Sequence, residues 1–336
     1  MNALAERYAR LRVAVVGDFC LDRYWDIDPA RQERSIETGR VVHNVVGVRA
    51  QAGAAGTIVN NLAALGVGSV HAVGFAGADG EGFELRRALA ALPGLRLDHF
   101  LETDRRRTFT YGKPLVLHPD RPPEELDRLD SKNWTPTPDD VQERLIESVR
   151  ALADQVDGVI LMDQVEVPET GVITRRLREA VGDVARRRPG LLILADSRRG
   201  LADYPPLDFK MNRAELANLV GATRDLTLEE VRAAAERLAD VGQRRVFVTM
   251  ADEGLLGAEP GGGVRFVPAL PVRGPIDVVG AGDAVTANLA AALAAGTALA
   301  DALELASAAA SVVIHQLGTT GTASLPQIEA VLKRRS

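Results

Sequence analysis

The stretch GPIDVVGAGDAVTANLAAAL, residues 274–293, places a single acid, Asp283, between a glycine turn and an alanine-rich run. The run is typical of a helix, and Gly280 and Gly282 permit backbone conformations and a close ligand approach that other residues do not. Backbone N–H groups in such a turn, at a helix N-terminus, can bind an anion. The stretch therefore predicts a phosphate-binding turn with a carboxylate beside it, although an acid in the first helical turn also stabilises a helix by itself.

The composition argues against several classes of protein. The net charge of −6 gives no sign of the basic surface that nucleic-acid binding requires. Cys20 is the only cysteine, so no disulfide can form within the chain, and such cysteine usage is typical of a reducing compartment. The N-terminal residues lack the apolar core of a signal peptide, and no apolar run is suited to span a bilayer. We therefore expect a cytoplasmic protein that binds neither nucleic acid nor a membrane.

Short apolar runs alternate with helical patterns along the chain. The runs that predict buried parallel strands are residues 12–18, 69–77, 157–163, 191–196 and 244–250. This alternation favours an α/β layered sheet. Asp18, Asp163 and Asp196 each end one of these strands, where ligands bind in open parallel sheets. Each acid could instead cap a helix, but three at one rim favour a polar crevice.

Two segments break the alternation. Residues 23–50 and 100–118 alternate weakly and have no crossover helix, which predicts extra strands that form a small β appendage beside the main sheet. Residues 118–140 are rich in proline and charge, and predict a loop with little regular structure.

Two common nucleotide-binding motifs are missing. The chain has no G-x-x-x-x-G-K-[ST] sequence, which excludes a P-loop nucleotide site. The first strand leads into VVGDFCLD, which has one glycine where a nicotinamide-dependent dehydrogenase has three. The chain therefore lacks the fingerprint of that class of enzyme.

Residues 277–283, DVVGAGD, resemble the D-T-T/V-G-A-G-D signature of the ribokinase-like (PfkB) sugar kinases. Further segments resemble motifs of this family in the same order: residues 13–25, 52–66, 195–200, 209–221, 246–256 and 306–322. The first of them, VAVVGDFCLDRYW, is especially similar to VVGDxxLDRYW of the heptose 7-phosphate kinases. The resemblance covers nearly the whole chain. It implies a single domain over residues 1–336, a ribokinase-like three-layer α/β/α sandwich with a mostly parallel central sheet, and a β-sheet lid formed by the two inserted segments.

The resemblance implies a role for each matching residue. Asp283 would accept the proton of a sugar hydroxyl as that oxygen attacks the γ-phosphorus of ATP. Gly280, Ala281 and Gly282 would form the anion hole with the N–H of Asp283. The implied sugar contacts are Asp18, Asp22, Gly53, Thr57 and Asp163. The implied nucleotide contacts are Asn212, Glu215, Thr249 and Gly254.

The same resemblance implies one cation and leaves a second one open. Glu215 would organise Mg²⁺, mainly through water, because this ion keeps much of its hydration shell. Asn212 and Glu215 also have the i, i+3 spacing of an ordinary polar helix face, so a purely structural role stays open for both. The need for a monovalent cation is open as well.

The departures from the family pattern lie on the sugar side. Thr57 stands where the family has asparagine, and Ala54 stands where it has a second glycine. The acceptor therefore cannot be named from the sequence. If the acceptor already carries a phosphate, it needs cationic anchors. The candidates, which otherwise read as solvated surface, are Arg105, Arg106, Arg107 and Lys113.

We expect an ATP-dependent kinase of a sugar or sugar phosphate that forms a homodimer through its lid, as the family does. A non-catalytic sugar or nucleotide sensor that keeps the fold, and a nucleoside kinase, are the alternatives. An intact Asp283 opposes the sensor, because a protein that only binds has no need of a base at that position.

Overall fold

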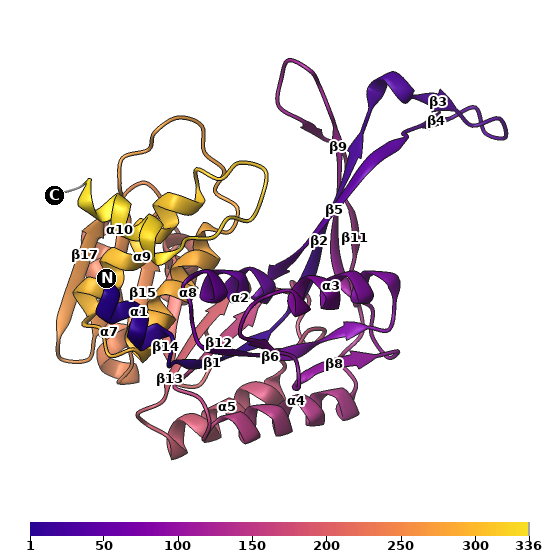
Figure 1. Ribbon diagram of the computed structural model, residues 1–336. Coiled ribbons are helices and arrows are strands. Elements are labelled where there is room, and N and C mark those ends of the chain that lie inside the picture. The colour runs from indigo at the N-terminus through magenta and orange to yellow at the C-terminus, as the bar shows by residue number, and fades with distance from the viewer. Residues whose placement is uncertain (335–336) are drawn as a thin grey trace.

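The computed structural model describes residues 1–334, and its largest element is a ten-stranded, mostly parallel sheet (Figure 1). The strand order is β17-β16-β15-β14-β13-β12-β1-β6-β7, with β8 also paired to β6. These strands are β1 (Arg12–Gly17), β6 (Ser69–Gly77), β7 (Leu95–Arg96), β8 (Phe100–Thr103), β12 (Gly158–Asp163), β13 (Leu192–Ser197), β14 (Asp208–Asn212), β15 (Val246–Thr249), β16 (Gly254–Glu259) and β17 (Gly263–Pro268). Only the β15–β16 and β16–β17 pairs are antiparallel.

Helices cover both faces of this sheet, which confirms the three-layer sandwich. One face carries α1 (Asn2–Tyr8), α2 (Ala55–Ala64), α3 (Gly80–Ala90), α8 (Ala281–Ala294), α9 (Leu299–Val313) and α10 (Leu325–Lys333). The other face carries α4 (Asp139–Leu152), α5 (Arg175–Arg187), α6 (Arg213–Leu219) and α7 (Leu228–Gly242). None of the helices within residues 1–334 has the length and apolar character needed to cross a membrane.

The first strand shows why the apolar runs are continuous. Side chains of a strand point alternately to the two faces of its sheet. In β1, Val13 and Val15 pack in the core under α2 and α8, while Ala14 and Val16 pack in the core under α4 and α5. Because both faces are covered, both sets of side chains must be apolar.

A second, five-stranded sheet, for which we keep the name lid, projects from the main body (Figure 1). Its order is β10-β9-β2-β5, with β11 also paired to β9. Its strands are β2 (Phe19–Ile27), β5 (Val45–Ala54), β9 (Phe109–Val116), β10 (Glu124–Glu125) and β11 (Leu129–Ser131). Between β2 and β5 the chain forms the turn η1 (Pro29–Arg31) and a two-stranded hairpin of β3 (Glu33–Arg34) and β4 (Val41–Val42).

The lid differs from the predicted one in two places. Residues 100–103 belong to the main sheet, as β8, because Phe100 and Leu101 are buried against it. The charged segment 118–140, predicted as an irregular loop, contributes the edge strands β10 and β11. These strands have two and three residues, too few for an alternating pattern to be visible in the sequence.

Candidate active site

The glycine turn leads directly into α8. Gly280 has a φ of 82°, in the left-handed region that favours glycine, and no side chain caps the helix. The N–H of Ala281 donates to the carbonyl oxygen of Val278 at 3.2 Å. The N–H groups of Gly282 and Asp283 have no acceptor within residues 1–334. Within the described residues two N–H groups at the turn are therefore free, and the N–H of Ala281 is already used. Its part in an anion hole stays a prediction.

A buried ion pair lies next to this turn. Nζ of Lys210, on β14, donates to Oδ2 of Asp196, on β13, over 2.8 Å. The hydroxyl of Thr286 lies 2.8 Å from the same oxygen. A Cβ added to Gly282 would lie 3.2 Å from Nζ of Lys210, so the ammonium group adjoins the turn.

Of these side chains, Asp196 was predicted only as a strand-end acid, and Lys210 and Thr286 were not among the predicted site residues. A lysine inside the strand DFKMN was one available signal, because a charged side chain is rarely buried without a partner. The other signal was Thr286, three residues after Asp283 and therefore on the same side of α8.

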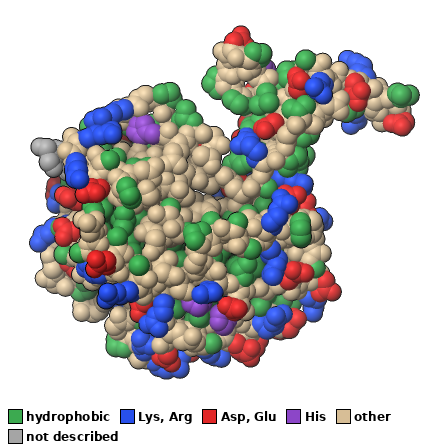
Figure 2. All heavy atoms as spheres, viewed as in Figure 1, with side chains coloured by type: hydrophobic (Ala, Val, Ile, Leu, Met, Phe, Trp, Pro, Cys, Tyr) green, Lys and Arg blue, Asp and Glu red, His purple; other side chains and the backbone are tan. Residues whose placement is uncertain are grey.

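Asp283 is partly exposed and lies among several charges. Its pKa is raised to about 7, mainly because the carboxyl is shielded from water and next because of the negative charge of Asp196. The ammonium of Lys210 opposes this rise, while the charge of Asp22 adds to it. Asp283 is thus close enough to be influenced by charges on both the lid and the main sheet. Figure 2 shows the surface hollowed between the lid and the body.

Asp22 lies at the base of the lid and is almost completely buried. Its Oδ1 is 3.4 Å from Nζ of Lys113, which also donates to the hydroxyl of Tyr24 at 3.3 Å. Burial raises the pKa of Asp22, and the charge of Lys113 limits that rise. A Cβ added to Gly53 would come too close to Oδ2 of Asp22 for a non-bonded contact. The glycine at position 53 therefore gives this carboxylate its space.

Two threonines flank the glycine turn. A Cβ added to Gly280 would lie 3.4 Å from Cβ of Thr320 and 3.6 Å from Cγ2 of Thr57. The hydroxyls of both threonines are buried and have no hydrogen-bond partner within the described chain. Buried polar groups are normally paired, so two unpaired hydroxyls beside the glycine turn mark it as a candidate binding site. Thr320 was not among the predicted site residues.

Asp18 does not face the hollow as predicted. It is completely buried, and its two carboxylate oxygens accept hydrogen bonds from the backbone N–H groups of Gln164, Val165 and Val172. Burial and the neighbouring charge of Asp163 raise its pKa to about 6. In this structure Asp18 therefore holds the chain that follows β12, and its role as a sugar contact stays a prediction.

Asp163 is likewise buried and engaged. Its Oδ2 accepts hydrogen bonds from the side chains of Ser197, Arg199 and Tyr204, at 2.9, 2.7 and 2.9 Å. Only Oδ1 is left without a partner among residues 1–334, and it is also buried. In this structure the carboxylate fixes the chain after β13, and a direct sugar contact by Asp163 stays a prediction.

Of the four predicted phosphate anchors, Lys113 lies beside Asp22. Arg105 and Arg107 are exposed, and their roles stay predictions. Arg106 is buried and cannot serve as an anchor, because its guanidinium is committed to the backbone. Its acceptors are the carbonyl oxygens of Thr135, Pro136 and Thr170.

The predicted nucleotide contacts lie where β14 and β15 end. Asn212 and Glu215 form a reciprocal cap at the start of α6: Oδ1 of Asn212 accepts from the N–H of Glu215, and Oε2 of Glu215 accepts from the N–H of Asn212. Thr249 is paired with Asn212 across the strands. Gly254 has a φ of 131° and packs against the backbone of β17, which explains the glycine without a ligand.

Comparison with known proteins places the chain in a family. The sequence profile of the pfkB family carbohydrate kinases matches residues 192–327, which include the glycine turn and Asp283. The bifunctional protein HldE of Bradyrhizobium sp. (strain ORS 278) is 34% identical over 96% of this chain. The chain belongs to the pfkB carbohydrate kinase family. The HldE of Azotobacter vinelandii is 33% identical over 99% of the chain. The chain spans 63% and 66% of the lengths of these two relatives.

Solved structures show that this pfkB family member has the ribokinase-like fold. Arabidopsis thaliana ribokinase, solved with ribose and ATP, has a TM-score of 0.67 at 22% identity, over 96% of this chain and 98% of its own. Escherichia coli phosphofructokinase-2, solved with substrates and products, has a TM-score of 0.72 at 20% identity, over 96% and 99%.

One departure from the pfkB pattern has a visible backbone effect. Ala54, where the motif has its second glycine, precedes α2 with φ 54° and ψ −117°. A residue with a Cβ is strained at such angles. The chain therefore keeps a glycine-like backbone beside Gly53 even though the glycine has been replaced.

Proposed function

We propose that this protein transfers the γ-phosphoryl group of ATP to a hydroxyl group of a sugar or a sugar phosphate. The observation that carries the proposal is the position of Asp283, a partly exposed carboxylate with a raised pKa, next to two free backbone N–H groups. The charges of Asp22, on the lid side, and of Lys210, on the sheet side, both shift the pKa of Asp283. Asp283 is therefore suited to lie between an acceptor and a phosphate.

Each step of the transfer has a residue suited to it. Asp22 and the unpaired hydroxyl of Thr57 bind hydroxyl groups of the acceptor. Asp283 receives the proton of the attacking hydroxyl, and its pKa near 7 suits a base at neutral pH. The N–H of Gly282 and the ammonium of Lys210 stabilise the negative charge on the transferred group. The lid excludes water, which limits hydrolysis of ATP.

The residues present fit a bound Mg²⁺ ion held largely by water. The residues described include no cluster of three or more metal-ligating side chains. Glu215 is half-buried and keeps Oε1 free, because only its Oε2 is used in the helix cap. An ion held mainly by ATP phosphates and water needs few protein ligands, and Glu215 would hold it through water. When bound, Mg²⁺ neutralises charge on the phosphates. Titration of ATP binding against Mg²⁺ in Glu215→Gln tests this assignment without an activity readout.

A monovalent cation beside the glycine turn is a further proposal. Escherichia coli phosphofructokinase-2 has been solved in complex with potassium. In the present chain, Asp277 accepts hydrogen bonds from the N–H groups of Val279 and Gly318, so that two loops meet next to the turn. Replacing K⁺ with Na⁺ or with an organic cation in the titration of ATP binding tests whether the protein requires a particular monovalent cation.

We also propose a cytoplasmic homodimer that associates through the lid. Val45, Val46 and Val48 on β5 are each about half exposed, and such apolar residues on a sheet are normally covered. Sedimentation of the protein, with Val46→Lys as the variant, tests this proposal.

A sensor without catalytic activity is the alternative that the altered acceptor side favours, and a nucleoside kinase is the other. One experiment separates all three. Purified protein is mixed with Mg²⁺, radiolabelled ATP and panels of sugars, sugar phosphates and nucleosides, with Asp283→Asn as the control. Transfer to a sugar or sugar phosphate that Asp283→Asn lacks supports the proposal. Transfer only to nucleosides, or binding without transfer to any acceptor, contradicts it.

A further inference from the structure

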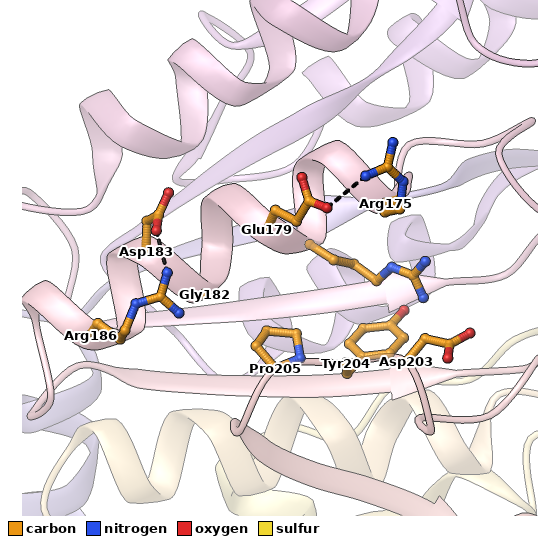
Figure 3. Close-up of a pocket in the computed structure, with 9 residues that line it drawn as sticks. Arg175, Glu179, Gly182, Asp183, Arg186, Asp203, Tyr204 and Pro205 are labelled. Atoms are coloured by element: carbon orange, nitrogen blue, oxygen red, sulfur yellow. Dashed lines mark hydrogen bonds and ion pairs between the residues drawn. The ribbon is translucent and has the colours of Figure 1, made fainter.

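A groove of about 640 Å³ lies away from the glycine turn, along α5 (Figure 3). One side is formed by α5 and the other by the chain between β13 and β14. The two sides meet where Gly182 packs against Pro205, because a Cβ at position 182 would lie only 3.1 Å from Cβ of Pro205. The volume is in the range of sites for small molecules.

Most charges along the groove are paired. Arg175 forms an ion pair with Glu179 at 2.8 Å, and Arg186 pairs with Asp183, as the dashed lines in Figure 3 show. These two pairs lie on exposed positions of α5, so they contribute little to stability. They also leave no surplus charge on that part of the surface.

Arg178 is the exception. Its side chain is only 11% exposed, and its Nε is buried without a hydrogen-bond partner within residues 1–334. The one carboxylate within 4 Å among the described residues is Glu169, at 3.9 Å from Nη2, and it already caps α5 by accepting from the N–H of Arg175. The guanidinium stacks over the ring of Tyr204, with its carbon 5.3 Å from the ring centroid. The guanidinium is thus nearly buried, with an unpaired Nε and only one long ion pair in the described part of the chain, so a closer anion would stabilise it.

The surroundings also favour one kind of anion. A planar carboxylate matches the two-pronged donor geometry of a guanidinium. A phosphate dianion would bring a second negative charge close to Asp203, an exposed acid that lines the groove and has no ion pair among residues 1–334. A hydroxyl or amino group on the same molecule could donate to Asp203.

We propose that this groove is a second binding site, for a small metabolite that carries one carboxylate, with Arg178 as the residue that binds the carboxylate. The site is connected to the rim of the sheet, because the hydroxyl of Tyr204 donates to Oδ2 of Asp163 at the end of β12. The proposal does not depend on the kinase activity.

Acetate serves as the probe, with chloride at equal ionic strength and inorganic phosphate as comparisons. Binding is measured by saturation-transfer NMR, and the unfolding midpoint by calorimetry. The test variant is Arg178→Met, which keeps the packing of the side chain against Tyr204. The matched control is Arg187→Met, an exposed arginine of α5 that does not line the groove.

We expect acetate to bind the natural protein and to raise its unfolding midpoint, and Arg178→Met to lose at least about tenfold in affinity. In chloride, the midpoint of Arg178→Met should change little, because the variant loses only the long ion pair with Glu169. Arg187→Met should behave as the natural protein. Arg178→Lys, which keeps the charge but not the two-pronged geometry, should bind acetate with intermediate affinity and is a second test if the first variant folds poorly.

Three results would overturn the proposal: no binding of acetate by the natural protein, equal binding by Arg178→Met, or tighter binding of inorganic phosphate than of acetate through Arg178.

Discussion

Lys210 and Asp196 form a 2.8 Å ion pair that is almost completely buried and lies next to Gly282 of the glycine turn. The pair comes from adjacent parallel strands and is completed by the hydroxyl of Thr286. It brings a positive group to the turn without leaving an unpaired charge in the core. Breaking a buried pair by removing one partner is costly, because it leaves the other charge uncompensated.

Replacing this lysine tests its two roles separately. Lys210→Met should lower the free energy of unfolding by about 3–5 kcal/mol and slow phosphoryl transfer by roughly 10²-fold or more. Chemical denaturation and steady-state kinetics measure the two effects.

A double variant is the control for Lys210→Met. Asp196→Leu combined with Lys210→Met removes both charges and should recover most of the stability without recovering activity. Full activity in Lys210→Met would show that the ammonium does not act on the transferred group.

The pH dependence of kcat/KM reports on Asp283 in the free protein. Its pKa is raised to about 7, mainly by burial, and a base must be deprotonated to act. We therefore expect kcat/KM to rise about tenfold per pH unit below this value and to level off above it. A profile that is already level at about pH 5 would mean that the pKa of the catalytic group is not raised.

The same raised pKa makes stability depend on pH. A carboxyl whose pKa is higher in the folded than in the unfolded state stabilises the fold at low pH, and this contribution is lost as the pH rises through about 7. Asp283→Asn, which cannot ionise, should therefore gain stability relative to the natural protein as the pH rises from about 4 to about 7, with little further change above. Denaturation midpoints across this range measure the difference, and a constant difference would contradict the assignment.

Ala54 should be a point of stored strain. Its φ of 54° and ψ of −117° are far better tolerated by glycine, so Ala54→Gly should raise the free energy of unfolding by about 1 kcal/mol. Ala55→Gly, one residue later and inside α2, is the control and should lower it. A loss of stability in Ala54→Gly would mean that the position carries no strain.

Gly53 should determine acceptor binding and leave ATP binding unchanged. A methyl group at this position would displace the carboxylate of Asp22, so Gly53→Ala should raise the KM for the acceptor by about tenfold or more. Gly80→Ala, where an added Cβ meets no atom within 4 Å, is the matched control. A rise in the KM for ATP instead would place the acceptor elsewhere.

The sequence was sufficient to predict the main sheet, because each parallel strand buries both faces and reads as a continuous apolar run. It was insufficient for β10 and β11, whose two or three residues are too short for any pattern. The lid boundary at Phe100 was missed because an apolar residue in a short strand can pack against either sheet.

Within the site, sequence motifs located the glycine turn and Asp283. They could not show which groups each acidic side chain contacts. Asp18 and Asp22 are four residues apart in one motif, yet the first accepts three backbone N–H groups and the second lies beside Lys113. Lys210 was missed because its partner, Asp196, is on another strand. Hydrogen bonding between distant segments depends on tertiary structure, which motif spacing does not record.

The central claim is that Asp283 removes a proton from the acceptor. The most direct measurement compares Asp283→Asn with the natural protein, once an acceptor is known, in single-turnover phosphoryl transfer and in ATP binding by calorimetry. We predict that transfer slows by about 10²- to 10⁴-fold while ATP binds with nearly unchanged affinity. Transfer at the natural rate in Asp283→Asn would contradict the account.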